Sequence, residues 1–194
     1  RAGALLDKEQ KERLKAINEE LSLAAVKFGN NLLAENNAFV MELGKDDLDG
    51  LPMSVRDQAR EKAEAMGFKD KYVFTLRKPS WIPFLTYSTR RDLRERIYKA
   101  YLARGNNGDS NDNKQLINDF IRLRTEKAHL LGYPSYAAYV TTDQMARTPQ
   151  AVYALLEEIW TPALDRAKAE LEEMTALFKN DHPDGTFESW DWWY

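Results

Sequence analysis

The sequence predicts an all-α protein built from long antiparallel helices, with at most a very small β element near residues 71–76. Apolar residues recur at steps of three and four through most of the chain, which is the spacing of one helix face. Only residues 71–76 form a convincing run of β-forming side chains. In the rest of the chain, residues that typically begin or end helices are separated by distances that match ordinary helix lengths. Helices are therefore expected to account for nearly all of the chain.

The first predicted helix begins at Asp7 and Gln10, which have the spacing of a capping box. An apolar stripe then continues for about 35 residues, well above the usual helix length. Its members are Leu14, Ile17, Leu21, Ala24, Phe28, Leu32, Phe39 and Leu43. Gly44 and the turn at 49–52 (Asp-Gly-Leu-Pro) end this helix, because glycine and proline at these positions stop helical hydrogen bonding.

A second helix is expected from a cap at Ser54 to Met66, with Gly67 as its C-terminal stop. The extended run at 71–76 then forms either one strand of a small hairpin or a buried connection. Both alternatives fit its cluster of Tyr, Val, Phe and Thr side chains. The sequence therefore places its only strand signal directly after the second helix.

Two prolines, Pro79 and Pro83, predict only a short helical turn in the next segment. Ser88 or Thr89 then caps a helix that reaches about Arg104. Its inward side chains are expected to be Leu93, Ile97, Ala100 and Tyr101.

Three further helices follow the polar, turn-rich loop at 105–113. They are predicted at 114–131, from Ser135 to Val140, and from a start at Thr148-Pro149 to about Asn180. Pro162 lies inside the last of these helices and is expected to kink or split it. A turn follows at 182–185, and Glu188 is expected to begin another helix.

At 194 residues the chain can hold one large domain or one and a half small ones. We expect a single helical body over residues 1–194, with two possible sub-units at 1–104 and 114–194 joined by the loop at 105–113.

The composition excludes several classes of protein. The net charge is −3 and the charges are interspersed, whereas a nucleic-acid-binding protein usually carries a basic field or stripe. No run of 18 apolar residues is present, so no membrane span is expected. The chain has no cysteine, which excludes disulfides and thiolate sites. A cytoplasmic location is expected, with a periplasmic one as the alternative.

No metal or catalytic site is predicted from the residues. A zinc site needs three or four ligands, often two histidines one helical turn apart, but His129 and His182 are far apart in the sequence. The loop acids Asp109 and Asp112 do not have the spacing of an EF-hand, so a plain solvent loop is preferred over a calcium site. No catalytic, cofactor-binding or metal-binding residue is assigned, and substrate-binding residues stay unknown.

One set of aromatic residues has two interpretations, a ligand wall or helix packing. Its helical spacing favours packing for most members, with a few tyrosines left to line a groove. The set is Trp81, Phe84, Tyr87, Tyr98, Tyr101, Tyr133, Tyr136 and Tyr139.

Several segments in this order resemble the M3 family of zinc metallopeptidases, which includes thimet oligopeptidase, neurolysin and oligopeptidase A. The segments are residues 30–33, 79–87, 91–98, 123–133, 145–152 and 190–194. The closing Trp-Asp-Trp-Trp-Tyr at 190–194 is most similar to the bacterial peptidyl-dipeptidase (Dcp) branch. The resemblance covers nearly the whole chain, and its ordered set of motifs is more specific than any one motif.

The resemblance implies an almost entirely helical fold in which two lobes enclose a narrow channel. It implies zinc held by a His-Glu-x-x-His helix, which activates water for the hydrolysis of short peptides. This chain contains no His-Glu-x-x-His, so none of the family's zinc ligands or catalytic residues has a counterpart here.

The leading hypothesis is a fragment upstream of the zinc motif, part of the N-terminal lobe of a zinc peptidyl-dipeptidase and a wall of its substrate channel. It implies no cofactor in this chain and zinc in the full-length parent. Its expected partners are the remaining catalytic lobe and short peptides, with self-association through an exposed apolar surface. The alternatives are a stand-alone helical interaction module and an enzyme of another type.

Overall fold

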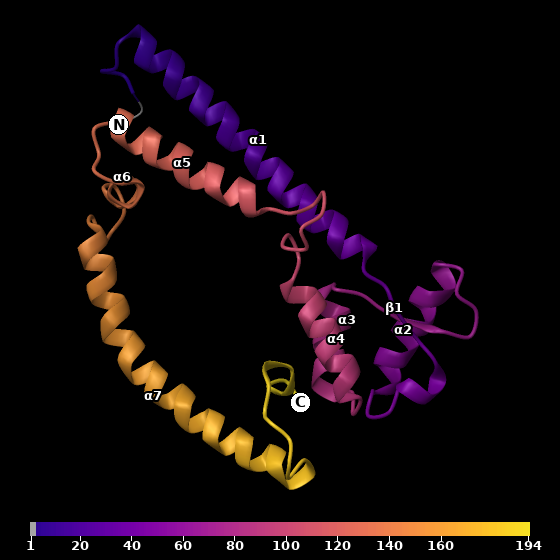
Figure 1. Ribbon diagram of the computed structural model, residues 1–194. Coiled ribbons are helices and arrows are strands. Elements are labelled where there is room, and N and C mark those ends of the chain that lie inside the picture. The colour runs from indigo at the N-terminus through magenta and orange to yellow at the C-terminus, as the bar shows by residue number, and fades with distance from the viewer. Residues whose placement is uncertain (1–2) are drawn as a thin grey trace. The chain divides into compact units, whose positions relative to one another are not determined.

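The structure is a computed structural model that describes residues 3–194, and it is mostly α-helical as the sequence predicted (Figure 1). The chain forms two compact units, each made from two separate stretches. Unit 1 comprises Arg1–Phe28 and Asn113–Leu177, and unit 2 comprises Gly29–Asp112 and Phe178–Tyr194. These stretches differ from the predicted sub-units at 1–104 and 114–194, which assumed that each sub-unit was continuous in sequence.

The helices within residues 3–194 are α1 (Lys8–Ala38), α2 (Met53–Ala65), α3 (Lys78–Tyr87), α4 (Arg91–Leu102), α5 (Lys114–Leu130), α6 (Tyr136–Thr141) and α7 (Pro149–Asp181). Two short 3-10 helices are η1 (Lys45–Asp47) and η2 (Ser189–Asp191). The strands are β1 (Met41–Leu43) and β2 (Tyr72–Phe74). None of the helices within these residues is both long and apolar enough to cross a membrane.

In unit 1 the first part of α1 lies beside α5 (Figure 1). The predicted capping box at the start of α1 is present: Gln10 N–H donates to Asp7 at 2.8 Å, and Asp7 N–H donates to Gln10 at 3.2 Å. Polar contacts then join the two helices. Arg13 donates two hydrogen bonds to Glu126, and Lys127 donates to Asn18 at 2.6 Å.

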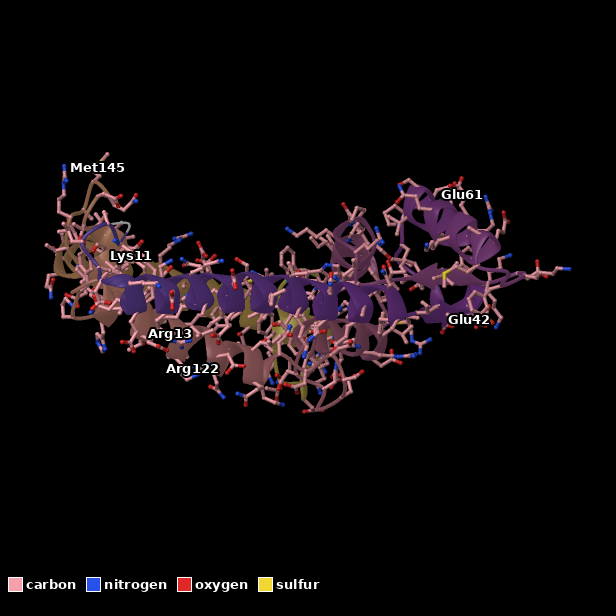
Figure 2. The ribbon with its side chains drawn as sticks, turned by 90° about the horizontal axis from the view of Figure 1, so that it is seen from above. Lys11, Arg13, Glu42, Glu61, Arg122 and Met145 are labelled. Carbon is pink, nitrogen blue, oxygen red and sulfur yellow. The ribbon has the colours of Figure 1, made fainter. Side chains whose placement is uncertain are left out.

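Charge pairing continues along the α1–α5 contact, where Arg13 and Arg122 share Glu20 as a partner. Figure 2 labels the two arginines. The hydrogen bond from Arg13 is the main cause that lowers the pKa of Glu126. Because these side chains are more than a third exposed, water screens the pairs, and they contribute little to stability.

Helix α7 begins where the sequence predicted, since Ala151 N–H donates to the Thr148 hydroxyl at 3.2 Å. A kink or a split at Pro162 was predicted; the helix continues through Pro162 without a split, and Figure 1 shows it curved along its length. Proline removes one donor from the ladder, but an exposed helix can bend and hydrate the freed carbonyl. No residue of α7 is buried within the described part of the chain.

The hydrophobic core of unit 2 lies between the two strands and helices α2, α3 and α4. Strand β1 pairs antiparallel with β2, with Glu42 opposite Val73. The core residues are Met41, Leu43, Leu48, Leu51, Ala59, Phe74, Leu76, Trp81, Phe84, Leu85, Leu93 and Ile97. Helices α2 and α3 both pack on the strand pair, which gives this small sheet a buried face.

The predicted extension of the first helix to Leu43 is therefore wrong. Met41 and Leu43 are buried while Glu42 is exposed, which is the period-two pattern of a strand. The predicted strand at 71–76 is present as β2, but its partner precedes α2, so neither a local hairpin nor a plain connection describes it. The two strands are far apart in the sequence, and the spacing of the apolar residues around Phe39 is compatible with a helix as well as with a strand.

Three other boundaries also differ from the prediction. Helix α2 starts after Pro52 rather than at a Ser54 cap, because proline already has the backbone angle that a helix start requires. The segment with Pro79 and Pro83 forms the full helix α3 rather than a short turn. Helix α4 begins after Arg90, and Glu188 begins only the 3-10 turn η2.

Candidate functional site

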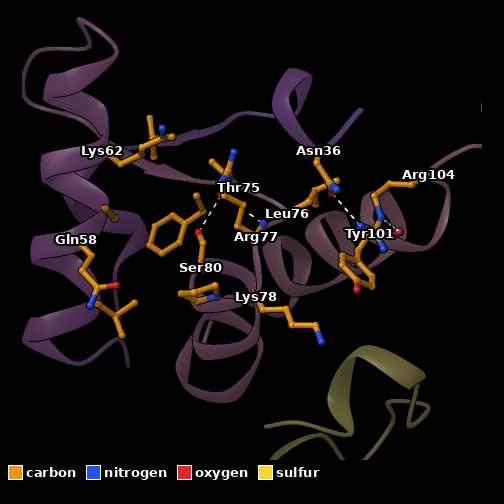
Figure 3. A pocket seen from close by; sticks show the side chains of 15 residues that line it. Asn36, Gln58, Lys62, Thr75, Leu76, Arg77, Lys78, Ser80, Tyr101 and Arg104 are labelled. Atoms are coloured by element: carbon orange, nitrogen blue, oxygen red, sulfur yellow. Dashed lines mark hydrogen bonds between the residues drawn. The ribbon is translucent and has the colours of Figure 1, made fainter. Parts of the chain in front are cut away.

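A groove in unit 2 lies between helix α2 on one side and the start of α3 and the end of α4 on the other (Figure 3), and residues of β2 also line it. Its volume is about 710 Å³. The lining residues come from the end of α1, one face of α2, the segment 73–80, and the end of α4. Volumes of this size are typical of small-ligand sites.

The lining carries positive charge and no carboxylate. Lys62, Arg77, Lys78 and Arg104 contribute cationic side chains, and none of the 15 lining residues is Asp or Glu. Arg104 is held in place, because it donates to Asn36 Oδ1 at 2.8 Å and to the Tyr101 carbonyl at 2.7 Å. The groove is therefore an electropositive surface in a chain with an acidic net charge.

The floor of the groove belongs to the core and is rigidly supported. The Tyr101 ring stacks on Trp81 with ring centroids 4.0 Å apart, and the Arg104 guanidinium lies 3.6 Å from the centroid of the Tyr101 ring. Thr75 N–H donates to the Ser80 hydroxyl at 2.9 Å, which fixes the turn between β2 and α3. These contacts preorganise the groove.

A buried ion-pair cluster attaches residues 190–194 to helix α4. Asp191 accepts hydrogen bonds from Arg91 Nη2 at 2.8 Å and from Arg94 Nη2 at 2.9 Å. The side chains of Arg94 and Asp191 are each only 1% exposed. Glu188 N–H also donates to Asp191 at 3.0 Å, so the same carboxylate closes the turn η2.

The electrostatics of this cluster favour the ionised carboxylate. Burial alone would raise the pKa of Asp191, but hydrogen bonds from Arg91, from Glu188 N–H and from Arg94 outweigh it and lower the pKa. The hydrogen bond to Asp191 in turn raises the pKa of Arg91. The pKa shifts of Asp191 and Arg91 both favour their ion pair, and the cluster acts as a structural anchor.

Aromatic contacts surround the anchor. The Arg94 guanidinium lies 4.0 Å from the centroid of the Tyr194 ring, and Lys99 lies 5.0 Å from that of Trp190. Trp193 meets Trp81 edge-on at 6.1 Å. The Trp-Asp-Trp-Trp-Tyr run thus packs on α3 and α4, and its aspartate supplies the charge that the buried arginine requires.

Glu35 ties the polar loop to helix α1. Its carboxylate accepts from Gly105 N–H at 2.8 Å and from the Asn107 amide at 2.9 Å, and the residue is 7% exposed. Its other oxygen, Oε1, is buried with no hydrogen-bond partner. The sequence analysis did not single out Glu35, although its place on the apolar stripe of α1 signalled that a buried carboxylate needed partners.

The two histidines are not brought together. His129 Nε2 lies 3.3 Å from the Pro134 carbonyl, whereas His182 packs against the Phe178 ring at 4.8 Å. Among residues 3–194 no three His, Asp or Glu side chains form a group that could hold a metal ion. The loop acids Asp109 and Asp112 accept from the backbone N–H groups of Asn111 and Gly108.

The aromatic set divides between packing and the groove. Trp81 and Phe84 are buried in the core, while Tyr101 lines the groove. In unit 1 the Tyr139 ring contacts those of Tyr133 and Tyr136, with ring centroids 5.3 and 5.8 Å apart. A few tyrosines were expected to line a groove, and Tyr101 is the one tyrosine among the 15 residues that line this groove.

Comparison with known proteins identifies the class to which this fold belongs. The sequence model of a family described as Peptidase family M3 matches residues 84–194. This match covers more than half of the chain, and it includes helices α4 to α7 and the anchor around Asp191. The chain belongs to peptidase family M3.

Individual relatives extend the similarity to the rest of the chain. The chain is 33% identical over 196 residues to a dipeptidyl carboxypeptidase of Salmonella typhimurium, covering 100% of this chain and 28% of that protein. It is 33% identical over 185 residues to an organellar oligopeptidase A of Arabidopsis thaliana, covering 92% and 23%. It is 31% identical over 195 residues to oligopeptidase A of Escherichia coli, covering 98% and 28%. The chain thus spans about a quarter of the length of the relatives it matches.

Proposed function

We propose that this chain is a non-catalytic helical part of a zinc-dependent peptidase of the peptidyl-dipeptidase or oligopeptidase type, and that its helices form a wall of the channel that admits short peptides. The observation that carries this proposal is similarity along the whole chain to peptidases of family M3. M3 peptidases are zinc enzymes in general, and the names of the relatives describe proteins that cleave peptides.

The residues of the described part do not fit a zinc site. His129 and His182 lie in different units, and no third ligand accompanies either of them in residues 3–194. The proposal therefore assigns the zinc and the bond-breaking groups to another part of the enzyme. What this chain contributes is a scaffold of long helices and a rigid, anchored unit 2.

Helix α7 supports a role beside another protein segment. Seven large apolar side chains on this helix are between 42% and 67% exposed. They are Tyr153, Leu155, Leu156, Ile159, Trp160, Leu171 and Leu177. Exposed apolar side chains gathered on one helix often contact further protein, and we assign this contact to the remaining catalytic lobe of the peptidase.

A chimera tests the proposal. In the dipeptidyl carboxypeptidase of Salmonella typhimurium, the aligned segment would be replaced by this chain, and hydrolysis of a blocked tripeptide would be measured with and without a chelator. We expect chelator-sensitive cleavage by the chimera and none by the 194-residue chain alone. A chimera that folds as a monomer yet does not cleave would refute the scaffold role, and chelator-sensitive cleavage by the chain alone would refute the non-catalytic assignment.

The second candidate is a stand-alone helical interaction module, which the uncovered face of α7 also favours. Both candidates predict that the isolated chain self-associates through this face. We expect sedimentation velocity to show concentration-dependent association, which the double substitution Ile159→Glu/Trp160→Glu should abolish. A monomer at every concentration would contradict this use of the surface, and an active chimera would favour the peptidase over the module.

A further inference from the structure

The groove of unit 2 has an excess of positive charge that the peptidase proposal does not use. Four of its lining residues are cationic, and none is acidic. The whole chain has the opposite balance, with 31 acidic and 28 basic residues. Since this excess is local, it lowers the energy of a negatively charged ligand at this one place.

The four cations are not neutralised by carboxylates within residues 3–194. Arg77 donates to the amide oxygen of Asn37 at 3.1 Å, and Arg104 donates to the amide oxygen of Asn36. Lys62 and Lys78 form no ion pair in the described part of the chain. Elsewhere in unit 2, arginines such as Arg91 are paired with carboxylates. The groove cations thus keep their attraction for an external anion.

Helix α3 adds partial positive charge to the same place. Its first residues, Lys78 to Ser80, line the groove, and the N-terminus of a helix carries the positive end of the helix dipole. The Ser80 oxygen accepts from Thr75 N–H, so its own hydroxyl proton remains able to donate to a ligand oxygen. The helix end and the cations therefore act on the same ligand.

The arrangement favours an extended ligand over a single compact anion. Lys62 projects from α2 on one side of the groove, whereas Lys78 and Arg104 lie on the other side (Figure 3). The floor between them is apolar and comprises parts of Val55, Ala59, Val73, Phe74, Leu76, Pro79 and Tyr101. A ligand that matches this surface carries negative charges at intervals, with apolar groups between them.

We propose that the groove binds an acidic peptide segment. Its carboxylates would pair with Lys62, Arg77, Lys78 and Arg104, and its apolar side chains would lie on the floor beside Tyr101. The inference goes beyond the scaffold role and does not depend on it, because it rests only on groove residues of unit 2.

Fluorescence polarisation with the 194-residue chain tests the inference. The probe is a fluorescein-labelled hexapeptide in which Glu alternates with Leu, and the reference peptide has Gln in place of each Glu. We expect the Glu peptide to bind at least tenfold more tightly, with affinity falling as salt rises, because salt screens charge pairs at an exposed groove.

Two charge-matched variants localise the binding. The groove variant is Lys62→Glu/Lys78→Glu, and the control is Lys69→Glu/Lys168→Glu, which makes the same change in net charge outside the groove lining. All four lysines are exposed, so both variants should keep the circular dichroism and thermal unfolding of the parent chain. The groove variant should weaken Glu-peptide binding roughly tenfold, and the control less than twofold.

Three results would overturn the inference. The first is equal affinity for the Glu and Gln peptides. The second is an equal loss of affinity in both variants, which would indicate attraction to net charge rather than to the groove. The third is displacement of the bound Glu peptide by ATP at the same or a lower concentration, which would identify a small phosphate ligand instead of a peptide.

Discussion

Replacing Asp191 with alanine would leave the Arg94 guanidinium buried without its carboxylate partner. Arg94 is 1% exposed and would keep its hydrogen bond to the Ser88 carbonyl at 2.6 Å and its contact with the Tyr194 ring. Its Nε already lacks a partner. The substitution would also remove the acceptor for Glu188 N–H that closes the turn η2.

The expected cost follows from burial. Removing one partner of a buried ion pair costs about 3–5 kcal/mol, because the remaining charge is left desolvated. A folded domain is stable by only about 5–15 kcal/mol, so Asp191→Ala should remove a large fraction of the stability of unit 2. Asp191→Asn should cost less, since the amide oxygen can still accept one hydrogen bond.

Urea unfolding followed by tryptophan fluorescence measures the effect, since Trp190 and Trp193 lie beside the anchor in the same unit. The control is Glu170→Ala, which removes the partner of Arg166 in an exposed helical pair and should leave the free energy of unfolding unchanged. A decrease of less than about 1 kcal/mol in the free energy of unfolding of Asp191→Ala would refute the reasoning, because the Arg94 guanidinium would then not be left desolvated and unpaired.

Three further predictions concern unit 2. Because the folded-state pKa of Asp191 is lowered, the ionised carboxylate stabilises the folded chain above the ordinary aspartate pKa of about 4, and this stabilisation is lost as pH falls below that value. The difference in unfolding free energy between the parent chain and Asp191→Asn, measured by urea titration, should therefore narrow below about pH 4. Gly50→Ala should destabilise the chain by more than about 1 kcal/mol in thermal unfolding, because the φ of Gly50 is +78° and an added Cβ would lie 2.2 Å from a backbone oxygen. Gly29→Ala in helix α1, where an added Cβ meets no atom within 4 Å, should stabilise the chain by about 0.5–1 kcal/mol in the same assay. Glu35→Ala should speed hydrogen exchange at Gly105 N–H without a similar change in β2, and unchanged exchange there would contradict the role of this carboxylate.

The sequence predicted those elements whose signals are local. Ser135 caps α6 by accepting from Ala138 N–H at 3.1 Å, and Thr148 starts α7, both as the cap residues indicated. Helix α5 ends at Leu130 with Gly132 just beyond it, because glycine readily adopts the positive φ of a C-terminal stop. Caps, glycines and apolar spacing within one helix require no knowledge of distant residues.

The failures at strand β1, at the groove and at the anchor all involve partners far apart in the sequence. Strand β1 was assigned to a helix because its partner β2 lies beyond α2 in the sequence, and the residues around β1 give no local signal of that pairing. The groove was missed for the same reason, since its four cations come from α2, the segment after β2 and the end of α4, and each resembles ordinary surface charge in the sequence. The anchor was missed because Arg94 and Asp191 are 97 positions apart.

The anchor has a consequence for how the protein is made. Arg94 leaves the ribosome 97 residues before Asp191, and at about 5–20 residues per second this corresponds to a delay of roughly 5 to 20 seconds. During that interval the arginine side of α4 lacks the carboxylate that neutralises it and the tryptophans that cover it. We therefore expect nascent unit 2 to be accessible to chaperones and proteases until residues 190–194 emerge, because those side chains complete the packing of a helix synthesised long before them.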